Sequence, residues 1–131
     1  MKYLIMMSQS ADGDAGGPAW TPEEVEASWA HMKQIHQELV ERGELLATEK
    51  LAGPGAAKKV TSDGVTAPVV TDGPFPEAKE FLAGFWMVDV DSEQRAIEIA
   101  ARTSAAPGPG GTATGTPIEV RPIMDAPARD W

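Results

Sequence analysis

The chain has no cysteine, few basic residues and no long apolar run, and each absence excludes a class of protein or partner. Without cysteine it can form no disulfide, no thiolate metal site and no cysteine nucleophile. Eleven basic residues stand against 20 acidic ones, and the net charge of −9 repels phosphate backbones and anionic lipids. Nucleic acid and membrane surfaces are therefore not expected partners. The apolar run at residues 3–7 is too short for a signal-peptide core or a membrane span, which favours a cytoplasmic protein.

The 131 residues are enough for one domain that buries roughly two-thirds of its unfolded surface, with a flexible tail from about residue 124. Periodicity and turn residues predict helices at residues 22–42 and 92–103. They also predict strands at residues 3–7, 44–51, 81–90 and 117–123, and a hairpin of residues 58–62 and 65–71 closed near Asp63 and Gly64. The glycine-rich residues 105–116 are expected to form a flexible loop.

This order of elements predicts a ferredoxin-like α+β fold, βαββαβ with an inserted β-hairpin. Two helices can cover only one face of a four-stranded sheet. The strands at residues 3–7 and 81–90 are nonetheless apolar on both faces, so the second face also needs cover. A second copy of the chain, packed sheet against sheet, would supply that cover. The patterning therefore predicts a homodimer formed through the sheet face.

Local signals define both ends of the first helix. Thr21 can cap it, Pro22 suits the first helical position, and Glu24 completes a capping box. Gly43 can end it by adopting the left-handed conformation. The apolar stripe is expected at Val25, Trp29, Met32, His36, Leu39 and Val40. The second helix is expected to be capped by Asp91.

Two carboxylates are candidate catalytic residues. Strand alternation places Glu49 on one face with Leu45, Ala47 and Leu51, so its carboxylate is expected to be buried or beside a cavity, where it must be paired or protonated. Asp72 stands at a strand end before Gly73 and could bind a ligand or move a proton. Its alternative role is that of a turn residue whose side chain accepts backbone hydrogen bonds.

Arg121 and His36 are candidate substrate-binding residues. In the last strand Ile118 and Val120 are expected under the helices, which turns Glu119 and Arg121 towards the opposite face. Arg121 offers a bidentate fork for a substrate carboxylate, or for Glu49 or Asp72 in a structural ion pair. His36 lies in the helical apolar stripe, where a histidine is either a core residue or a ligand-binding one. No metal site is expected, because the two histidines, His31 and His36, lie on different faces of one helix.

Residues 72–85, DGPFPEAKEFLAGF, resemble the signature of the DGPF branch of the YCII-related family, which reads roughly DGPF-x-E-x-K-E-x-L-x-G-F. The resemblance covers nearly the whole chain and implies a dimeric α+β barrel. It includes Lys79, which lies near two acids and could hold an anionic group, and Arg121. Where the family commonly has Gly-Glu-Gly-Leu, this chain has Thr48-Glu49-Lys50-Leu51, which keeps the acid and loses both glycines. Members of the branch are often associated with extracytoplasmic-function sigma factors, which implies a regulatory protein partner.

Two functions follow from these features. The first is small-molecule binding, or catalysis without a cofactor, with Glu49 and Asp72 as acid–base groups and Arg121 orienting an anionic ligand in a pocket on the sheet side. The alternative is a regulatory interaction module in sigma-factor control, without catalysis. Polar residues that converge on a cavity would favour the first function. Mutually paired residues together with an exposed apolar patch elsewhere would favour the second.

Overall fold

The computed structural model describes residues 1–10, 19–73 and 80–124 of the chain. Its helices are α1 (Pro22–Glu41) and α2 (Glu93–Ser104), with short 3₁₀ turns at Pro54–Ala56 and Pro109–Gly111. The strands are β1 (Lys2–Ser10), β2 (Leu45–Lys50), β3 (Lys58–Thr61), β4 (Val69–Asp72), β5 (Glu80–Asp89) and β6 (Ile118–Pro122). The predicted order of elements is confirmed. The predicted flexible tail lies outside the described residues.

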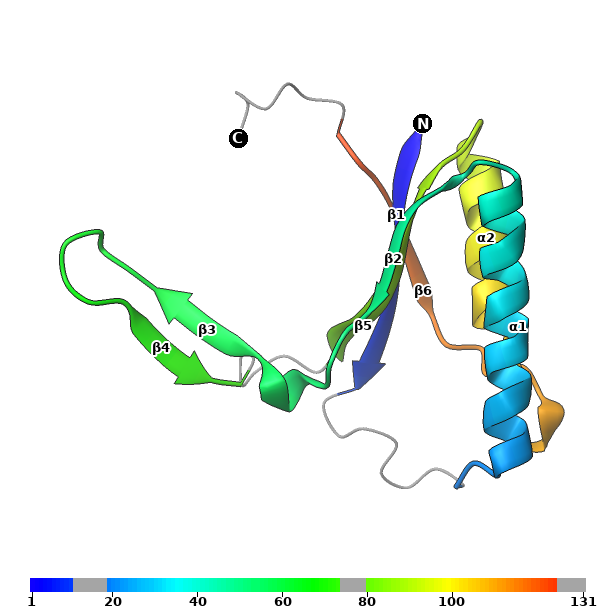
Figure 1. Cartoon of the computed structure of the whole chain (residues 1–131), viewed down its shortest axis with the longest axis horizontal. Coiled ribbons are helices and arrows are strands. Elements are labelled where there is room, and N and C mark those ends of the chain that lie inside the picture. Colours follow the sequence, from blue (N-terminus) through cyan, green and yellow to red (C-terminus); the bar gives the residue numbers. More distant parts are fainter. Residues whose placement is uncertain (11–18, 74–79, 125–131) are drawn as a thin grey trace.

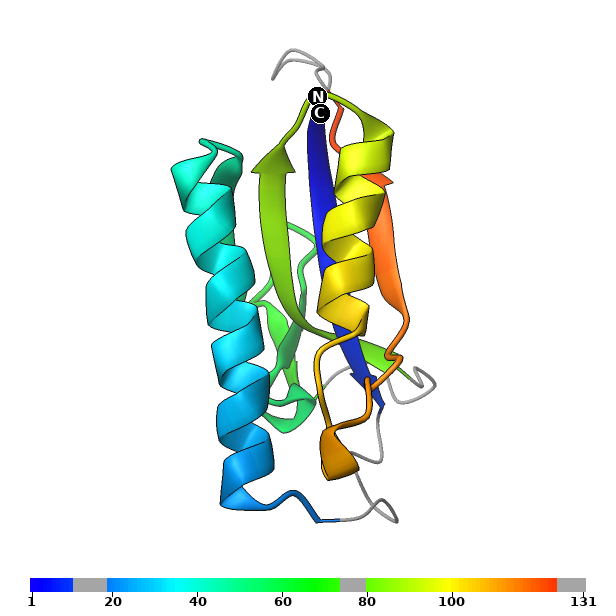
Figure 2. The ribbon, with the colours of Figure 1, turned by 90° about the vertical axis from the view of Figure 1, so that its right-hand side faces the viewer.

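Two sheets and two helices make up the fold. Strands β2, β5, β1 and β6 form, in that order, a four-stranded sheet in which all neighbours are antiparallel. Strands β3 and β4 form a separate two-stranded sheet. Both helices lie on one face of the four-stranded sheet (Figure 1, Figure 2). The α+β class is therefore confirmed, and so is the expectation that the helices cover only one face.

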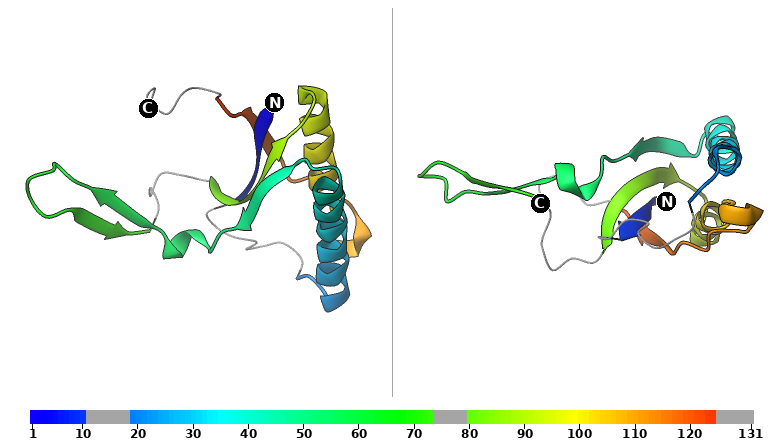
Figure 3. Two further views of the ribbon diagram at one scale, coloured as in Figure 1. Left: turned by 45° about the horizontal axis from the view of Figure 1, so that its top comes forward. Right: turned by 90° about the horizontal axis from the view of Figure 1, so that it is seen from below.

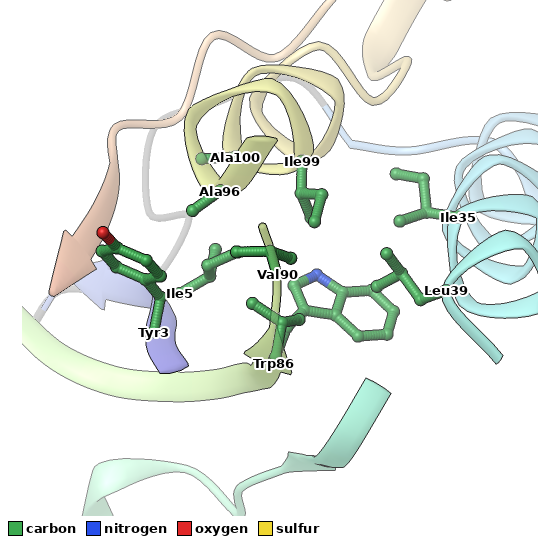
Figure 4. Close-up of a cluster of buried hydrophobic side chains, with 10 residues drawn as sticks. Tyr3, Ile5, Ile35, Leu39, Trp86, Val90, Ala96, Ile99 and Ala100 are labelled. Carbon is green, nitrogen blue, oxygen red and sulfur yellow. The ribbon is translucent and has the colours of Figure 1, made fainter. Parts of the chain in front are cut away.

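The hydrophobic core lies between the helices and that face (Figure 4). Tyr3 and Ile5 of β1 are paired with Val88 and Trp86 of β5, and cross-strand partners point to the same side of a sheet. All four are buried against residues of the helices, which are Ile35, Leu39, Ala96, Ile99 and Ala100. The alternation of β1 and β5 thus supplies one row of core residues and leaves a second apolar row on the helix-free face.

The ends of α1 are as predicted, and its apolar stripe is confirmed at Met32, His36 and Leu39 but not at Trp29 and Val40. The Thr21 hydroxyl accepts from the Glu24 amide at 3.1 Å, and the Glu24 carboxylate accepts from the Thr21 amide at 2.8 Å. The stripe predicted through Trp29 and Val40 is wrong, because these side chains are 69% and 55% exposed whereas Ile35 is buried. The helix meets the sheet along a narrower line of residues spaced three and four apart, which are Met32, Ile35, His36 and Leu39.

The hairpin exists, with shorter strands and a longer turn than predicted. Asp63 accepts from the amides of Val65 and Thr66 at 2.9 and 2.8 Å, and this fixes a loop of residues 62–68 in place of a two-residue turn. We refer to residues 58–72 as the arm. It extends away from the four-stranded sheet on the side opposite the helices (Figure 1, Figure 3).

A register shift in β2 overturns the predicted face of Glu49. Leu45 pairs with Val88, but a bulge follows, so that Ala47 pairs with Met87 and Glu49 with Phe85. Leu45 therefore shares the helix side with Val88, while Glu49 shares the opposite side with Phe85. Glu49 is exposed, so the predicted burial of its carboxylate is wrong. The extra residue changes which side chains face the core from that point on.

The segment at residues 105–116 differs from the expected flexible loop, because hydrogen bonds hold it to α2. Thr114 donates to the carbonyl of Ala106 through its amide, at 2.9 Å, and to that of Ser104 through its hydroxyl, at 3.1 Å.

The N-cap of α2 is Ser92, whose hydroxyl accepts from the Arg95 amide at 3.2 Å, and the expected cap at Asp91 is wrong by one residue. Within the described residues, no helix is both long enough and apolar enough to cross a membrane.

Candidate functional site

A cleft of about 460 Å³ lies on the helix side of the sheet, between α1 and the edge formed by β2 and β5. Its apolar wall comes from Met7, Met32 and Trp86, with Trp29 of α1 also lining it. The polar lining residues are Ser28, Thr48, Glu49 and Lys50. The volume is in the range of small-molecule sites, which are mostly apolar with a few polar groups. The cleft explains why Trp29 is exposed, since α1 and β2 do not close over it.

Gly84 allows β2 to lie close to β5 beside the cleft. A Cβ atom at this position would stand 3.0 Å from the Glu49 carbonyl oxygen and 3.5 Å from the Lys50 Cα. Any side chain would therefore push the two strands apart or distort them. A glycine inside an otherwise apolar strand is a signal for close backbone approach, and the sequence contained that signal at Gly84.

Trp86 separates the cleft from the core. The side chain is only 4% exposed, and its indole N–H has no hydrogen-bond partner among the described residues. The ring centroids of His36 and Trp86 are 6.0 Å apart, with the planes tilted by 41°. His36 is half-buried against this ring and does not line the cleft. Its position is that of a core-packing histidine, and a role in substrate binding stays a prediction.

The polar groups of the cleft come from β2 and α1. The Thr48 hydroxyl donates to the Phe85 carbonyl at 2.8 Å and so ties β2 to β5. Lys50 pairs with Gly84 across the strands, is exposed, and forms no ion pair within the described part of the chain. Among the residues that the structure describes, it is the one basic residue that lines the cleft. Glu49 precedes it and also lines the cleft, but its side chain shares the opposite face of the sheet with Phe85.

Arg121 lies on the other face of the sheet, as predicted. Arg121 pairs with Leu4 of β1, and Glu119 pairs with Met6. Both charged residues therefore share the helix-free face with these two apolar side chains. Strands β2 and β6 form opposite edges of the sheet, so that three strand spacings, about 14 Å, separate Glu49 from the strand of Arg121. Within one chain, an ion pair between Arg121 and Glu49 is therefore excluded.

Asp72 lies in a different sheet from Glu49 and Arg121. It ends β4 in the arm, its side chain is 84% exposed, and it forms an ion pair with Lys58, its cross-strand partner. The structure therefore brings neither Asp72 nor Arg121 to the cleft, and only Glu49 of the predicted set lines it. Lys79 lies outside the described residues.

Sequence reasoning missed most of the cleft. The groups it did not identify as site residues are Ser28, Trp29, Thr48, Lys50, Gly84 and Trp86. Lys50 was noted only as a departure from the family pattern, and Trp29 only as a core residue. No group of three or more metal-ligating side chains is found among residues 1–10, 19–73 and 80–124. The described residues of the site offer an apolar cavity, two hydroxyls and the ammonium group of Lys50 at the rim.

Comparison with known proteins identifies the family. Residues 1–124 match the family described as the YCII-related domain. The chain is also 36% identical, over 106 residues, to an uncharacterised protein from Rhizobium meliloti (strain 1021), and the match covers 80% of each chain. Nearly the whole chain is thus included, with both helices and the complete four-stranded sheet. This chain belongs to the YCII-related family.

Proposed function

We propose that this protein binds a small, largely apolar molecule carrying one anionic group in the cleft between α1 and β2. The observation that carries the proposal is the composition of the cleft. Aromatic and thioether side chains contribute much of its apolar surface, and Lys50 is the basic residue at its rim within the described part of the chain. Such a surface favours an apolar body, and the ammonium group of Lys50 favours a carboxylate or another small anion at the open end.

The overall charge of the chain strengthens the argument for Lys50. A net charge of −9 disfavours anions in general, so an anionic group needs a local base to be held at all. Glu49, the acid–base candidate of the sequence, turns its side chain to the opposite face of the sheet, so the proposal for the cleft is binding, and no cofactor is invoked. Asp72 has no part in this proposal, because its carboxylate is paired with Lys58 in the arm.

The proposal includes a homodimer formed through the helix-free face of the four-stranded sheet. That face carries Leu4, Met6, Phe85 and Met87, and the described helices lie on the other side. The order of the sheet, β2-β5-β1-β6, is consistent with the ferredoxin-like fold, two copies of which would form a dimeric α+β barrel. Arg121 lies on the same face without an ion pair among the described residues, and we propose that it meets an acid, Glu49 or Glu119, of the second copy. We also assign the chain to the DGPF branch on the signature at residues 72–85.

The test is a ligand screen with matched pairs of compounds. Small aromatic and aliphatic carboxylates, each paired with its neutral amide, are titrated into the isotope-labelled protein, and amide shifts are followed by NMR. Carboxylates are expected to shift the amides around Trp29, Thr48 and Gly84 more strongly than the amides do. Lys50→Gln is expected to abolish that preference while retaining binding of the apolar body. Lys33→Gln removes an exposed lysine that does not line the cleft and serves as its control.

Blocking the cleft provides the second arm of the test. Ser28→Phe places a ring in the cleft and is expected to prevent binding, whereas Ala30→Phe adds the same ring to an exposed position of α1 that does not line it. Binding that survives Ser28→Phe would refute the location. Equal affinity for carboxylates and amides in the wild type would refute the anionic group.

A further inference from the structure

We infer that the arm is a clasp for a second copy of this chain, and that the apolar pair Val60 and Val70 packs against that copy. This inference rests on the sheet-face homodimer proposed above and adds a second contact to it. The arm is otherwise unexplained. It lines no part of the cleft between α1 and β2, and it contributes nothing to the core.

The arm exposes apolar side chains that a single chain leaves uncovered. Val60 and Val70 are cross-strand partners and therefore share one face of the hairpin, where they are 60% and 57% exposed. Val65, at the tip, is 89% exposed. A two-stranded hairpin alone is marginally stable in water, and three or more strands or a packing partner are normally required. The arm therefore needs a surface to pack on.

The position of the arm indicates which surface that is. It extends on the helix-free side of the four-stranded sheet (Figure 1, Figure 3). Two sheets packed face to face are about 10 Å apart, whereas the four residues of β3 span about 13 Å and the loop of residues 62–68 extends the arm further. An arm of that reach passes alongside the sheet of a second copy and extends to the layer behind it.

The area of the sheet face supports a second contact. The face is four strands wide, about 19 Å, and its strands have 9, 6, 10 and 5 residues, about 25 Å on average. These dimensions give a flat area of about 470 Å², whereas each partner buries roughly 800 Å² of accessible surface in a stable dimer. One face of the paired strands of the arm, about 13 Å by 10 Å, adds about 130 Å² before the loop is counted. The arm therefore enlarges the contact that the sheet face alone would provide.

Charge also favours a copy of the same chain. The arm contains two lysines and two aspartates, Lys58, Lys59, Asp63 and Asp72, which cancel, so the net charge of −9 lies entirely in the rest of the chain. A neutral arm can approach a second acidic chain without repulsion. At the root of the arm, a groove of about 250 Å³ lined by Leu51, Pro54 and Leu82 extends the apolar surface from the sheet towards the hairpin.

The experiment measures the dimer dissociation constant by sedimentation equilibrium. Val60→Lys/Val70→Lys is expected to weaken the dimer about 100-fold or more, because it would place two charges in an apolar contact. The control is Thr61→Lys/Thr71→Lys, two exposed residues on the opposite face of the same hairpin, and it is expected to leave the constant within a few-fold of the wild type. Both variants add the same charge to an acidic chain, so a difference between them reports the apolar contact. Phe85→Lys, on the sheet face, is expected to dissociate the dimer regardless of the arm.

Each result has a separate meaning for the two proposals. If Phe85→Lys dissociates the dimer and both arm variants leave it intact, the sheet-face dimer stands and the clasp is refuted. The valines of the arm would then be assigned to a different protein partner. If the wild-type chain is monomeric at every concentration, the dimer and the clasp both fail, and the ligand screen on the cleft remains valid for the monomer. Dissociation by the Thr61/Thr71 control alone would also overturn the assignment to the Val60–Val70 face.

Discussion

Replacing Arg95 by methionine should destabilise the protein, because Arg95 neutralises a buried carboxylate at the junction of three elements. Glu44, 8% exposed, precedes β2, and Arg95 belongs to α2. The Arg95 Nε donates to Glu44 Oε2 at 2.9 Å and its terminal nitrogen donates to Oε1 at 2.9 Å, which is a bidentate pair. Arg42, at the end of α1, lies 2.9 Å from the same carboxylate. The pair therefore joins the end of α1 and the start of β2 to α2.

The expected loss for Arg95→Met is about 2–3 kcal/mol of unfolding free energy at neutral pH. Removing one partner of a fully buried ion pair costs about 3–5 kcal/mol, since the other charge is left unpaired. Here Arg42 still neutralises part of the charge on Glu44, so the expected loss of unfolding free energy lies at or below the lower end of that range. The corresponding fall in Tm is about 8–12 °C. Urea denaturation at fixed protein concentration measures the change, with Glu98→Gln as control. That substitution removes an exposed carboxylate 3.3 Å from the same arginine and should cost less than about 0.5 kcal/mol.

The pH dependence provides the sharper test. Hydrogen bonding from Arg95 holds the pKa of the Glu44 carboxyl below its ordinary value of 4.5. A lowered folded-state pKa contributes stability that is present above about pH 4.5 and is lost as the pH falls through the folded-state value. The wild type and Arg95→Met should therefore converge in stability below pH 4.5. A loss under 0.5 kcal/mol at neutral pH, or a difference that persists unchanged in acid, would refute the argument.

Two further predictions concern the cleft and the corrected face of α1. Gly84→Ala should cost about 1–2 kcal/mol in urea denaturation, because its Cβ would stand 3.0 Å from the Glu49 carbonyl oxygen, and unchanged stability would show that β2 can move away freely. Ile35→Ala should cost about 2–4 kcal/mol since Ile35 is fully buried, whereas Trp29→Ala should cost less than about 1 kcal/mol. The reverse order of these two losses would mean that the helix packs on the predicted stripe after all.

Features that depend on neighbouring residues were readable from the sequence. The capping box of Thr21 and Glu24 and the end of α1 at Gly43, where φ is +69°, involve only local hydrogen bonds and backbone geometry. The order of strands and helices followed from periodicity. The placement of Val120 on the helix side and Arg121 on the free side is confirmed, since strand alternation alone determines it.

The candidate site was not readable, because it depends on contacts between distant segments. The bulge between Leu45 and Ala47 is a relation between β2 and β5, and it turned Glu49 away from the predicted core. Burial of Ile35 in place of Trp29 reflects how α1 is rotated against the sheet, which helical periodicity fixes only to within one residue. The sequence by itself determined the order of the elements, the ends of α1 and the second apolar row of the sheet. Only the tertiary structure decided which side chains line the cleft, because that requires the packing of α1 against a shifted β2.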